Sequence, residues 1–385
     1  MKYFDYAAST PLDEKAASAY VKAATEYYGN SSSLHDIGDA AHELLENCRS
    51  GFAQLFNVPK EGIYFTSGGS EANYLGIQAL LSASPKTGKH IISSMAEHSS
   101  VRNSMEKVKQ FGYEVTFIPF NKDGQIDVED VKKAIRTDTI LISIQHGNPE
   151  IGTLQPVEEV SQLCRDHDIL LHSDCVQSFG KVDITKVVQS VDSFTISAHK
   201  FHGPKGVGLA FVHPRLRWDP YIPGTTHEYG FRPGTVNVPA IASMFVAAQQ
   251  AIEQLEHTRQ HVKRLYQGFM QELEPIKDQC IVYPSDLLST IGMRIKGLEG
   301  QVMMLECNRH GFAISTGSAC QVSKQSSSKT MMAMGVTGKK AKEFIRISFG
   351  KDTEDNDVKQ LVKTIVMIVR ESHIEYASSP MAKND

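Results

Sequence analysis

The feature that most constrains the fold is an alternation of short apolar runs with amphipathic stretches between residues 61 and 212. The runs are rich in β-branched and aromatic residues, which favours buried strands, and the stretches between them have helical spacing. This rhythm predicts an α/β fold whose large domain has a mostly parallel seven-stranded sheet flanked by helices, with ligands bound beyond the carboxyl ends of the strands. The runs are GIYFTS, HIISSM, EVTFIPF, TILISIQ, ILLHSD, SFTISA and GLAFVH.

A second, smaller domain is expected because 385 residues are too many for one ordinary core. A helical pattern over roughly 239–274 leads into a region where STIGMRI, FAIST and FIRISFG are typical of strands, which predicts an α+β domain. We therefore expect three parts. They are an N-terminal segment 1–15 packed with the small domain, a large domain 16–255 and a small C-terminal domain 256–385.

Charge and composition favour a small-molecule substrate. The formal net charge is -4 with acids and bases interspersed, which argues against nucleic acid or an anionic membrane as a partner. The start MKYFDYAAST has no basic segment before an apolar one, and no apolar run is long enough to cross a membrane, so a cytoplasmic protein is expected. The 6 cysteines are scattered without a CxxC pair or a His/Cys cluster, which predicts reduced thiols and no metal site.

Three segments at predicted strand ends carry groups suited to one cofactor. Residues 66–71, TSGGSE, join a glycine-rich turn to a helix start that can bind phosphate, although many such starts bind nothing. Lys200 follows SFTIS and could form a Schiff base, although most lysines are solvated. Asp174 ends ILLHSD and could keep a pyridine nitrogen protonated, although an N-cap aspartate is a common alternative. One strand-helix-strand unit separates Asp174 from Lys200, so both are expected at neighbouring strand ends.

With these motifs in order, the chain resembles the NifS/IscS-type cysteine desulfurases, in the class V aminotransferase group of fold-type I pyridoxal-phosphate enzymes. The resemblance spans nearly the whole chain and is greatest to the shorter Bacillus-type NifS-like desulfurases associated with NAD biosynthesis. The motifs that carry it are YFDYAASTP, YGNSSSLHDIG, FTSGGSEANYLGI, MAEHSSV, HGNPEIGTLQ, HSDCVQSFGK, SAHKFHGPKGVG, FRPGTVNV, STGSACQVSK and IRISFG.

The resemblance implies an enzyme that uses pyridoxal 5'-phosphate to convert L-cysteine to L-alanine and passes the sulfur to an acceptor protein. The sulfur would serve iron-sulfur cluster assembly, with the quinolinate synthase of NAD biosynthesis as one candidate client. Lys200 would bind the cofactor covalently and take the Cα proton, Asp174 would contact the pyridine nitrogen, and Gln177 would contact the phenolic oxygen. His98 would stack on the ring and handle the proton of the leaving sulfur.

The resemblance also assigns the remaining binding residues. Gly69, Ser70, Ser197 and His199 match the phosphate site. Thr235 matches a residue that reaches the phosphate of the neighbouring subunit, which implies an obligate homodimer. Asn148 and Arg346 match positions that hold the substrate carboxylate, for which a guanidinium fork is well suited.

Cys320 matches the cysteine that carries the persulfide. Its neighbours over 315–324, STGSACQVSK, are small and polar, which indicates a mobile loop able to carry a thiol from the cofactor to an acceptor. Lys324 and Lys329 could favour the thiolate. Cys164 and Cys307 lie in apolar helical patterns, where packing is the better interpretation.

The sequence departs from the family pattern at Pro149, where many relatives carry asparagine, and in the residues after Cys320, which leaves the acceptor open. A selenocysteine lyase or another class V aminotransferase remains an alternative, although an aminotransferase would have no use for Cys320 in a mobile loop. A catalytically silent assembly scaffold is a second alternative, and it would be expected to lack Lys200 or Cys320. A P-loop protein is disfavoured because GxxxxGK[ST] is absent.

Overall fold

The computed structural model describes residues 1–317 and 328–378, and within them seven strands form one sheet in the order β2-β8-β7-β6-β5-β3-β4. Strands β3 to β7 pair in parallel, whereas β8 is antiparallel to both β7 and β2. The prediction of a mostly parallel seven-stranded sheet is confirmed, because each apolar run forms one strand. The strands are β2 (Ile63–Thr66), β3 (His90–Ser94), β4 (Glu114–Ile118), β5 (Thr139–Ser143), β6 (Leu170–Asp174), β7 (Ser193–Ser197) and β8 (Gly208–Val212).

Both faces of this sheet are apolar and covered by helices, as parallel strands require. Successive strand residues point to opposite faces, so Tyr64 packs with α3 (Gly69–Ala83) and α4 (Ser99–Lys109), whereas Phe65 packs into a larger core on the other side. That larger core is closed by helices α1 (Glu14–Glu26), α2 (Asp36–Phe56), α5 (Val128–Ala134), α6 (Val157–Asp166), α7 (Thr185–Ser190) and α8 (Val238–Glu253).

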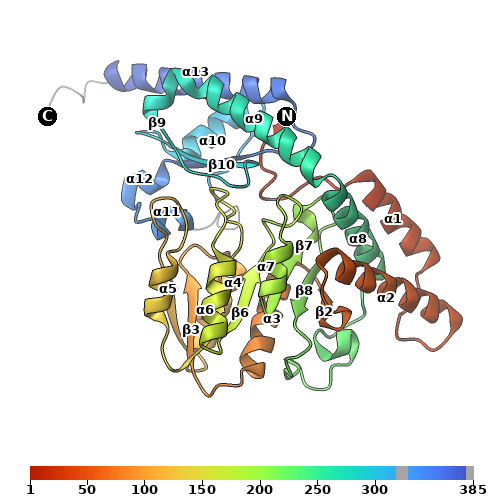
Figure 1. Cartoon of the computed structure of the whole chain (residues 1–385). Helices are drawn as coiled ribbons and strands as arrows, with labels where there is room; N and C mark the ends of the chain where they lie inside the picture. The colour runs from red at the N-terminus through yellow and green to blue at the C-terminus, as the bar shows by residue number, and fades with distance from the viewer. Residues whose placement is uncertain (318–327, 379–385) are drawn as a thin grey trace.

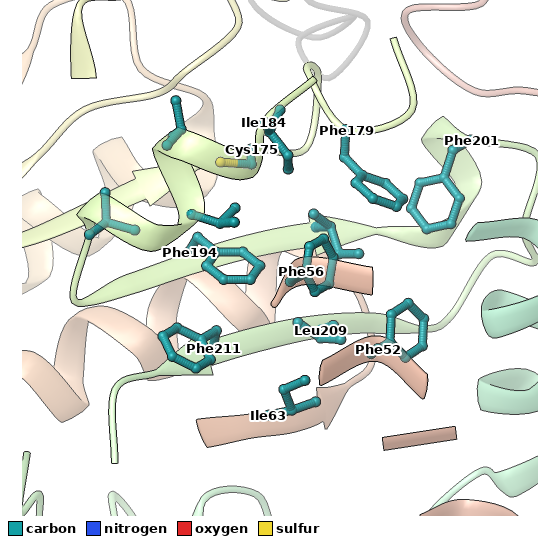
Figure 2. Packing of buried hydrophobic residues seen from close by; sticks show 14 of the residues in the cluster. Phe52, Phe56, Ile63, Cys175, Phe179, Ile184, Phe194, Phe201, Leu209 and Phe211 are labelled. Carbon is teal, nitrogen blue, oxygen red and sulfur yellow. The ribbon is translucent and has the colours of Figure 1, made fainter. Parts of the chain in front are cut away.

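Aromatic side chains fill the space between α2 and the sheet (Figure 2). Phe56 of α2 meets Phe194 of β7 edge to face, with ring centroids 4.9 Å apart, and Phe194 stacks on Phe211 of β8 at 5.1 Å. Aromatic pairs at these distances add stability beyond the area that they bury. The strand ends that carry the polar motifs are therefore held on a rigid layer.

The small part of the chain has its own apolar core. An antiparallel sheet of order β12-β10-β9 lies under helices α9 and α13, which Figure 1 shows at the top of the molecule. The first residues of the chain join this part, because β1 (Lys2–Tyr3) pairs with β11 (Phe312–Ala313). The elements are β9 (Cys280–Val282), β10 (Thr290–Ile295), β12 (Phe344–Ser348), α9 (Leu255–Leu273), α10 (Gly300–Arg309), α11 (Lys329–Ala333), α12 (Gly338–Lys342) and α13 (Asp355–Ser378).

The helical pattern over 239–274 is two helices, because α8 ends and α9 begins on either side of Gln254. The physical reason is that the two halves serve different cores. Met244 of α8 packs into the core of the large sheet, whereas Leu265 and Phe269 of α9 pack into the core of the small part. The predicted strand FAIST is also shorter than expected, since only Phe312 and Ala313 are in strand conformation. None of the helices in the described part of the chain has the length and apolar character that a membrane span requires.

Candidate active site

A cavity of about 220 Å³ opens at the carboxyl ends of the parallel strands, where ligands of α/β sheets bind. The segments after β2, β3, β5, β6 and β7 all contribute to its wall. This arrangement brings together most of the residues that the sequence nominated. Those lining the cavity are Gly69, Ser70, His98, Asp174, Gln177, Ser197, His199 and Lys200.

The carboxylate of Asp174 is held by two donors at the end of β6. Its Oδ1 accepts from the backbone N–H of Val176 at 2.9 Å, and its Oδ2 accepts from the side-chain amide of Asn73 at 2.7 Å. Asn73 lies on α3 and is 1% exposed. A buried acid that is oriented in this way can hold a proton on a pyridine nitrogen placed in the cavity.

Asn73 is the centre of a buried network that sequence reasoning missed. Its amide N–H groups donate to Asp174 and, at 2.9 Å, to Ser100 Oγ. Its carbonyl oxygen accepts from Thr195 Oγ and from His172 Nε2 at 3.1 Å. The feature of the sequence that could have identified Asn73 is its position one helical turn after Ser70, which places both residues on one face of α3.

His172 is neutral in this network, because burial lowers its pKa to about 3. Its Nδ1 lies 3.1 Å from Ser193 Oγ. Since Nε2 donates to Asn73, the hydroxyl of Ser193 must donate to Nδ1. His172 is thus a structural residue and fixes which way the Asn73 amide faces.

His98 caps the start of α4, and its hydrogen bonds make Nε2 the donor nitrogen of the ring. Its Nδ1 accepts from the backbone N–H of Ser100 at 3.2 Å and lies 2.8 Å from Ser100 Oγ, so in the neutral ring the proton is on Nε2. Burial lowers the pKa of His98, Asp174 raises it, and Lys200 and Lys329 lower it. Ser100 therefore links His98 to Asn73, and Asn73 links both to Asp174.

Glu97, next to His98, is a fully buried carboxyl group. Burial raises its pKa to about 8, although hydrogen bonds from Ser94 Oγ at 2.6 Å and from the N–H of Gln145 at 2.9 Å to Oε1 act against this. Its Oε2 has no hydrogen-bond partner within the described ranges. At neutral pH Glu97 is therefore mostly protonated, and it joins the turn after β3 to the segment after β5.

Lys200 lies in a short 3-10 turn, Ala198–Lys200, that follows β7. Its Nζ donates to the backbone carbonyls of Ala7 and Ala8 at 2.6 and 2.9 Å. These carbonyls belong to the N-terminal segment, which extends to the carboxyl ends of the strands of the large sheet. They hold the amine at the wall of the cavity, within reach of a carbonyl group bound there.

Gln177 is buried and held at both ends of its amide. Its Nε2 donates to the carbonyl of Ala7 at 2.9 Å, and its Oε1 accepts from Nζ of Lys181 at 2.8 Å. Burial, together with the charges of Lys200 and Arg346, lowers the pKa of Lys181 to about 7. The amide nitrogen of Gln177 has a second N–H, which leaves a donor for a ligand.

The start of α3 is suited to bind a phosphate. Gly68 has φ 147, which a residue with a side chain rarely adopts. A Cβ on Gly69 would lie 3.0 Å from Val176 Cγ2 and 3.3 Å from Ser197 Cβ, so a side chain there would crowd this part of the wall. Ser197 and His199 line the same cavity, and burial together with nearby lysines lowers the pKa of His199 to about 4.

This donor set fits pyridoxal phosphate. The helix start and Ser197 suit a phosphate, Asp174 suits a ring nitrogen, Gln177 suits a phenolic oxygen, and Lys200 suits an aldehyde. Three of the nominated residues that the structure describes do not line the cavity: Asn148, Arg346 and Thr235.

Asn148 is fully buried and uses its side chain within the protein. Its Oδ1 accepts from the N–H groups of Glu150 and Ile151, each at 2.9 Å, and its Nδ2 donates to Thr330 Oγ1 at 3.0 Å. The side chain therefore closes the turn that follows Gly147. Its neighbours Gly147 and Pro149 are the residues of this turn that line the cavity.

Arg346 lies on β12 and is 3% exposed. Its Nη2 donates to Asp5 Oδ1 at 2.7 Å and its Nη1 donates to the carbonyl of Pro149 at 3.0 Å, whereas Nε is buried without a partner among the described residues. Thr235 is exposed, in the segment between the 3-10 turn His227–Gly230 and α8. Cys320 lies outside the described residues.

Comparison with known proteins gives consistent similarities. The model of the family described as Aminotransferase class-V matches residues 2–361. The chain is 42% identical to "Putative cysteine desulfurase NifS" of Bacillus subtilis over 382 residues, which are 98% of this chain and 96% of that protein. It is 35% identical to "Cysteine desulfurase IscS" of Dictyoglomus turgidum, over 95% of this chain and 94% of that protein.

Two solved structures share the fold. The structure titled "NIFS-LIKE PROTEIN" superposes with a TM-score of 0.88 at 30% identity and covers 96% of this chain and 99% of its own. The structure titled "SspA in complex with cysteine" superposes with a TM-score of 0.76 at 30% identity and covers 91% of this chain and 99% of its own.

Proposed function

This chain belongs to the class V aminotransferase family and is a pyridoxal-phosphate-dependent cysteine desulfurase, and on that premise we propose that it holds the sulfur of L-cysteine as a persulfide on Cys320. One observation supports these roles: Lys200, Asp174 and His98 line the same cavity, beside the start of α3. These are the groups that the reaction requires.

Bound pyridoxal phosphate would supply an electron sink for the bond that is broken at the substrate Cα. Lys200, held by the carbonyls of Ala7 and Ala8, is the base that takes the Cα proton. Asp174 keeps a proton on the ring nitrogen, and its hydrogen bonds from Val176 and Asn73 fix its orientation.

The sulfur then passes to the enzyme. The thiolate of Cys320 attacks the substrate sulfur, the Cβ–S bond breaks, and protonation of the carbon fragment gives alanine. In sum, L-cysteine and the Cys320 thiol give L-alanine and a Cys320 persulfide. His98, with its proton on Nε2, is the group that we assign to proton transfer at the sulfur.

We assign binding of the substrate carboxylate to the neighbourhood of Arg346. Its guanidinium contacts the carbonyl of Pro149, a residue that lines the cavity, and its Nε has no partner among the described residues. Asn148 would act by shaping the turn that carries Pro149.

The protein would act as a homodimer and would pass the sulfur to an acceptor protein. Thr235 is exposed, which suits a residue that reaches the cofactor phosphate of a partner subunit in a homodimer. The acceptor would be an iron-sulfur assembly protein or a single client such as a quinolinate synthase. Cys48, Cys164, Cys175, Cys280 and Cys307 are free thiols, which supports a cytoplasmic enzyme.

The test is to incubate the purified protein with pyridoxal phosphate and L-cysteine and to assay alanine and sulfide. We expect both products, with alanine formed in proportion to sulfide when a reductant is present. Cys320→Ser should keep the cofactor and lose persulfide formation. A protein that binds the cofactor and yields neither product would point to the silent scaffold, and a clear preference for selenocysteine would point to a lyase.

A further inference from the structure

Lys181 occupies an unusual position behind the cofactor site. It lines a second cavity of about 70 Å³, between the large and small parts of the chain, which also borders Lys200. The other charged residues on this cavity are Asp13, Arg259 and Lys351, and Asp13 is paired with Lys351 at 2.5 Å. No carboxylate of the described chain lies within ion-pair distance of Lys181, and its Nζ donates to the neutral amide of Gln177.

Two contacts decide which way the Gln177 amide faces. The carbonyl of Ala7 can only accept a hydrogen bond, so it requires the amide nitrogen, and Nζ of Lys181 donates to the amide oxygen on the other side. The amide nitrogen is then directed to the carbonyl of Ala7 and to the cofactor cavity. In the flipped amide, Nζ would face N–H groups and the carbonyl of Ala7 would face an oxygen, so both contacts would be lost.

We infer that Lys181 is a positioning residue that holds Gln177 with its N–H group toward the cofactor, as a hydrogen-bond donor to the phenolic oxygen. This inference rests on the proposed cofactor site and adds a residue that never touches the cofactor. It explains why a lysine side chain lies in this position near Lys200 and Arg346 with no acidic partner among the described residues. Burial, together with the charges of Lys200 and Arg346, lowers the pKa of Lys181 to about 7, and the amine can donate to Gln177 Oε1 in either protonation state.

The inference is tested by a double-mutant cycle on cofactor binding in the full-length protein. Lys181→Met keeps the length of the side chain and removes the donors, and Gln177→Leu removes the amide. The measurements are the dissociation constant of pyridoxal phosphate and the pH at which the visible absorption band of the bound cofactor changes. Lys351→Met is the matched control, because Lys351 lines the same cavity and pairs with Asp13.

We expect Lys181→Met to weaken cofactor binding about tenfold, the scale of one hydrogen bond, and to shift the pH of the spectral change. In the Gln177→Leu background the same substitution should have little further effect, and Lys351→Met should bind the cofactor like the wild type. Lys181→Arg, which keeps donors only, should recover part of the affinity. If Lys181→Met does not fold, Lys181→Gln replaces it, because glutamine allows both orientations of the neighbouring amide and should weaken binding to a smaller extent.

Wild-type affinity and spectrum in Lys181→Met would overturn the inference. So would an undiminished effect of that substitution in the Gln177→Leu background, because Lys181 would then act without Gln177. A wild-type protein that binds no pyridoxal phosphate would instead refute the proposed function, so the two failures are distinct.

Discussion

Replacing Glu97 with glutamine should change how stability depends on pH. The folded-state pKa of Glu97 is raised by burial from an ordinary value of 4.5 to about 8. Between these two values the folded protein binds the proton and the unfolded chain releases it. The free energy of unfolding of the wild type therefore falls as the pH rises through this window, and the stability that Glu97 allows at low pH is lost.

The size of the effect follows from the width of the window. For each pH unit over which the folded protein holds one more proton than the unfolded chain, the free energy of unfolding changes by about 1.4 kcal/mol. Because Glu97 is 0% exposed, solvent screening does not reduce this figure much. From about pH 5.5 to about pH 7.5 the wild type should thus lose about 3 kcal/mol relative to Glu97→Gln, whose amide does not titrate.

The assay is urea unfolding of both proteins, stripped of cofactor, at matched pH values. The difference between the two unfolding free energies isolates Glu97, because all other titrating groups are common to both proteins. A difference that stays constant across this pH range would show that Glu97 is ionised in the folded protein and would refute the reasoning. A difference that changes in the opposite direction would refute it too.

Two further changes test the cofactor site. Asn73→Ala removes a buried amide that bonds to Asp174, Ser100, Thr195 and His172, so it should destabilise the protein by about 3 kcal/mol and weaken cofactor binding. Thermal unfolding and a cofactor titration measure both losses, and an unchanged affinity would mean that the network does not orient Asp174. Gly68→Ala places a side chain at φ 147 and should cost about 1–3 kcal/mol. Its cofactor titration should show weaker phosphate binding, and Gly224→Ala, at an exposed turn with open space around it, is the control.

Residues that follow a strand could be nominated from the sequence, since strand runs and strand ends are local signals. Asp174 and Lys200 were nominated in this way, and the structure brings both to one cavity with His98. Asn73 and Lys181 were not nominated, because their importance lies in partners on other elements. Asn73 bonds to a residue 101 positions away, and Lys181 acts on an amide that depends in turn on Ala7. No periodicity in the sequence reports such contacts.

The segment Asp5–Ala8 shows most clearly why the two parts of the chain form one site. Asp5 binds Arg346 on β12 at 2.7 Å, and the N–H of Ala7 donates to Ser348 Oγ on the same strand at 2.9 Å. The carbonyl of Ala7 accepts from both Gln177 and Lys200.

The backbone between Asp5 and Ala7 therefore connects an arginine of the small part to the amine of Lys200. A substitution of Asp5 should thus shift both the guanidinium of Arg346, which contacts Pro149, and the backbone carbonyls that accept from Lys200. The N-terminal segment is accordingly part of the active site through its backbone, where side-chain chemistry gives no hint of it.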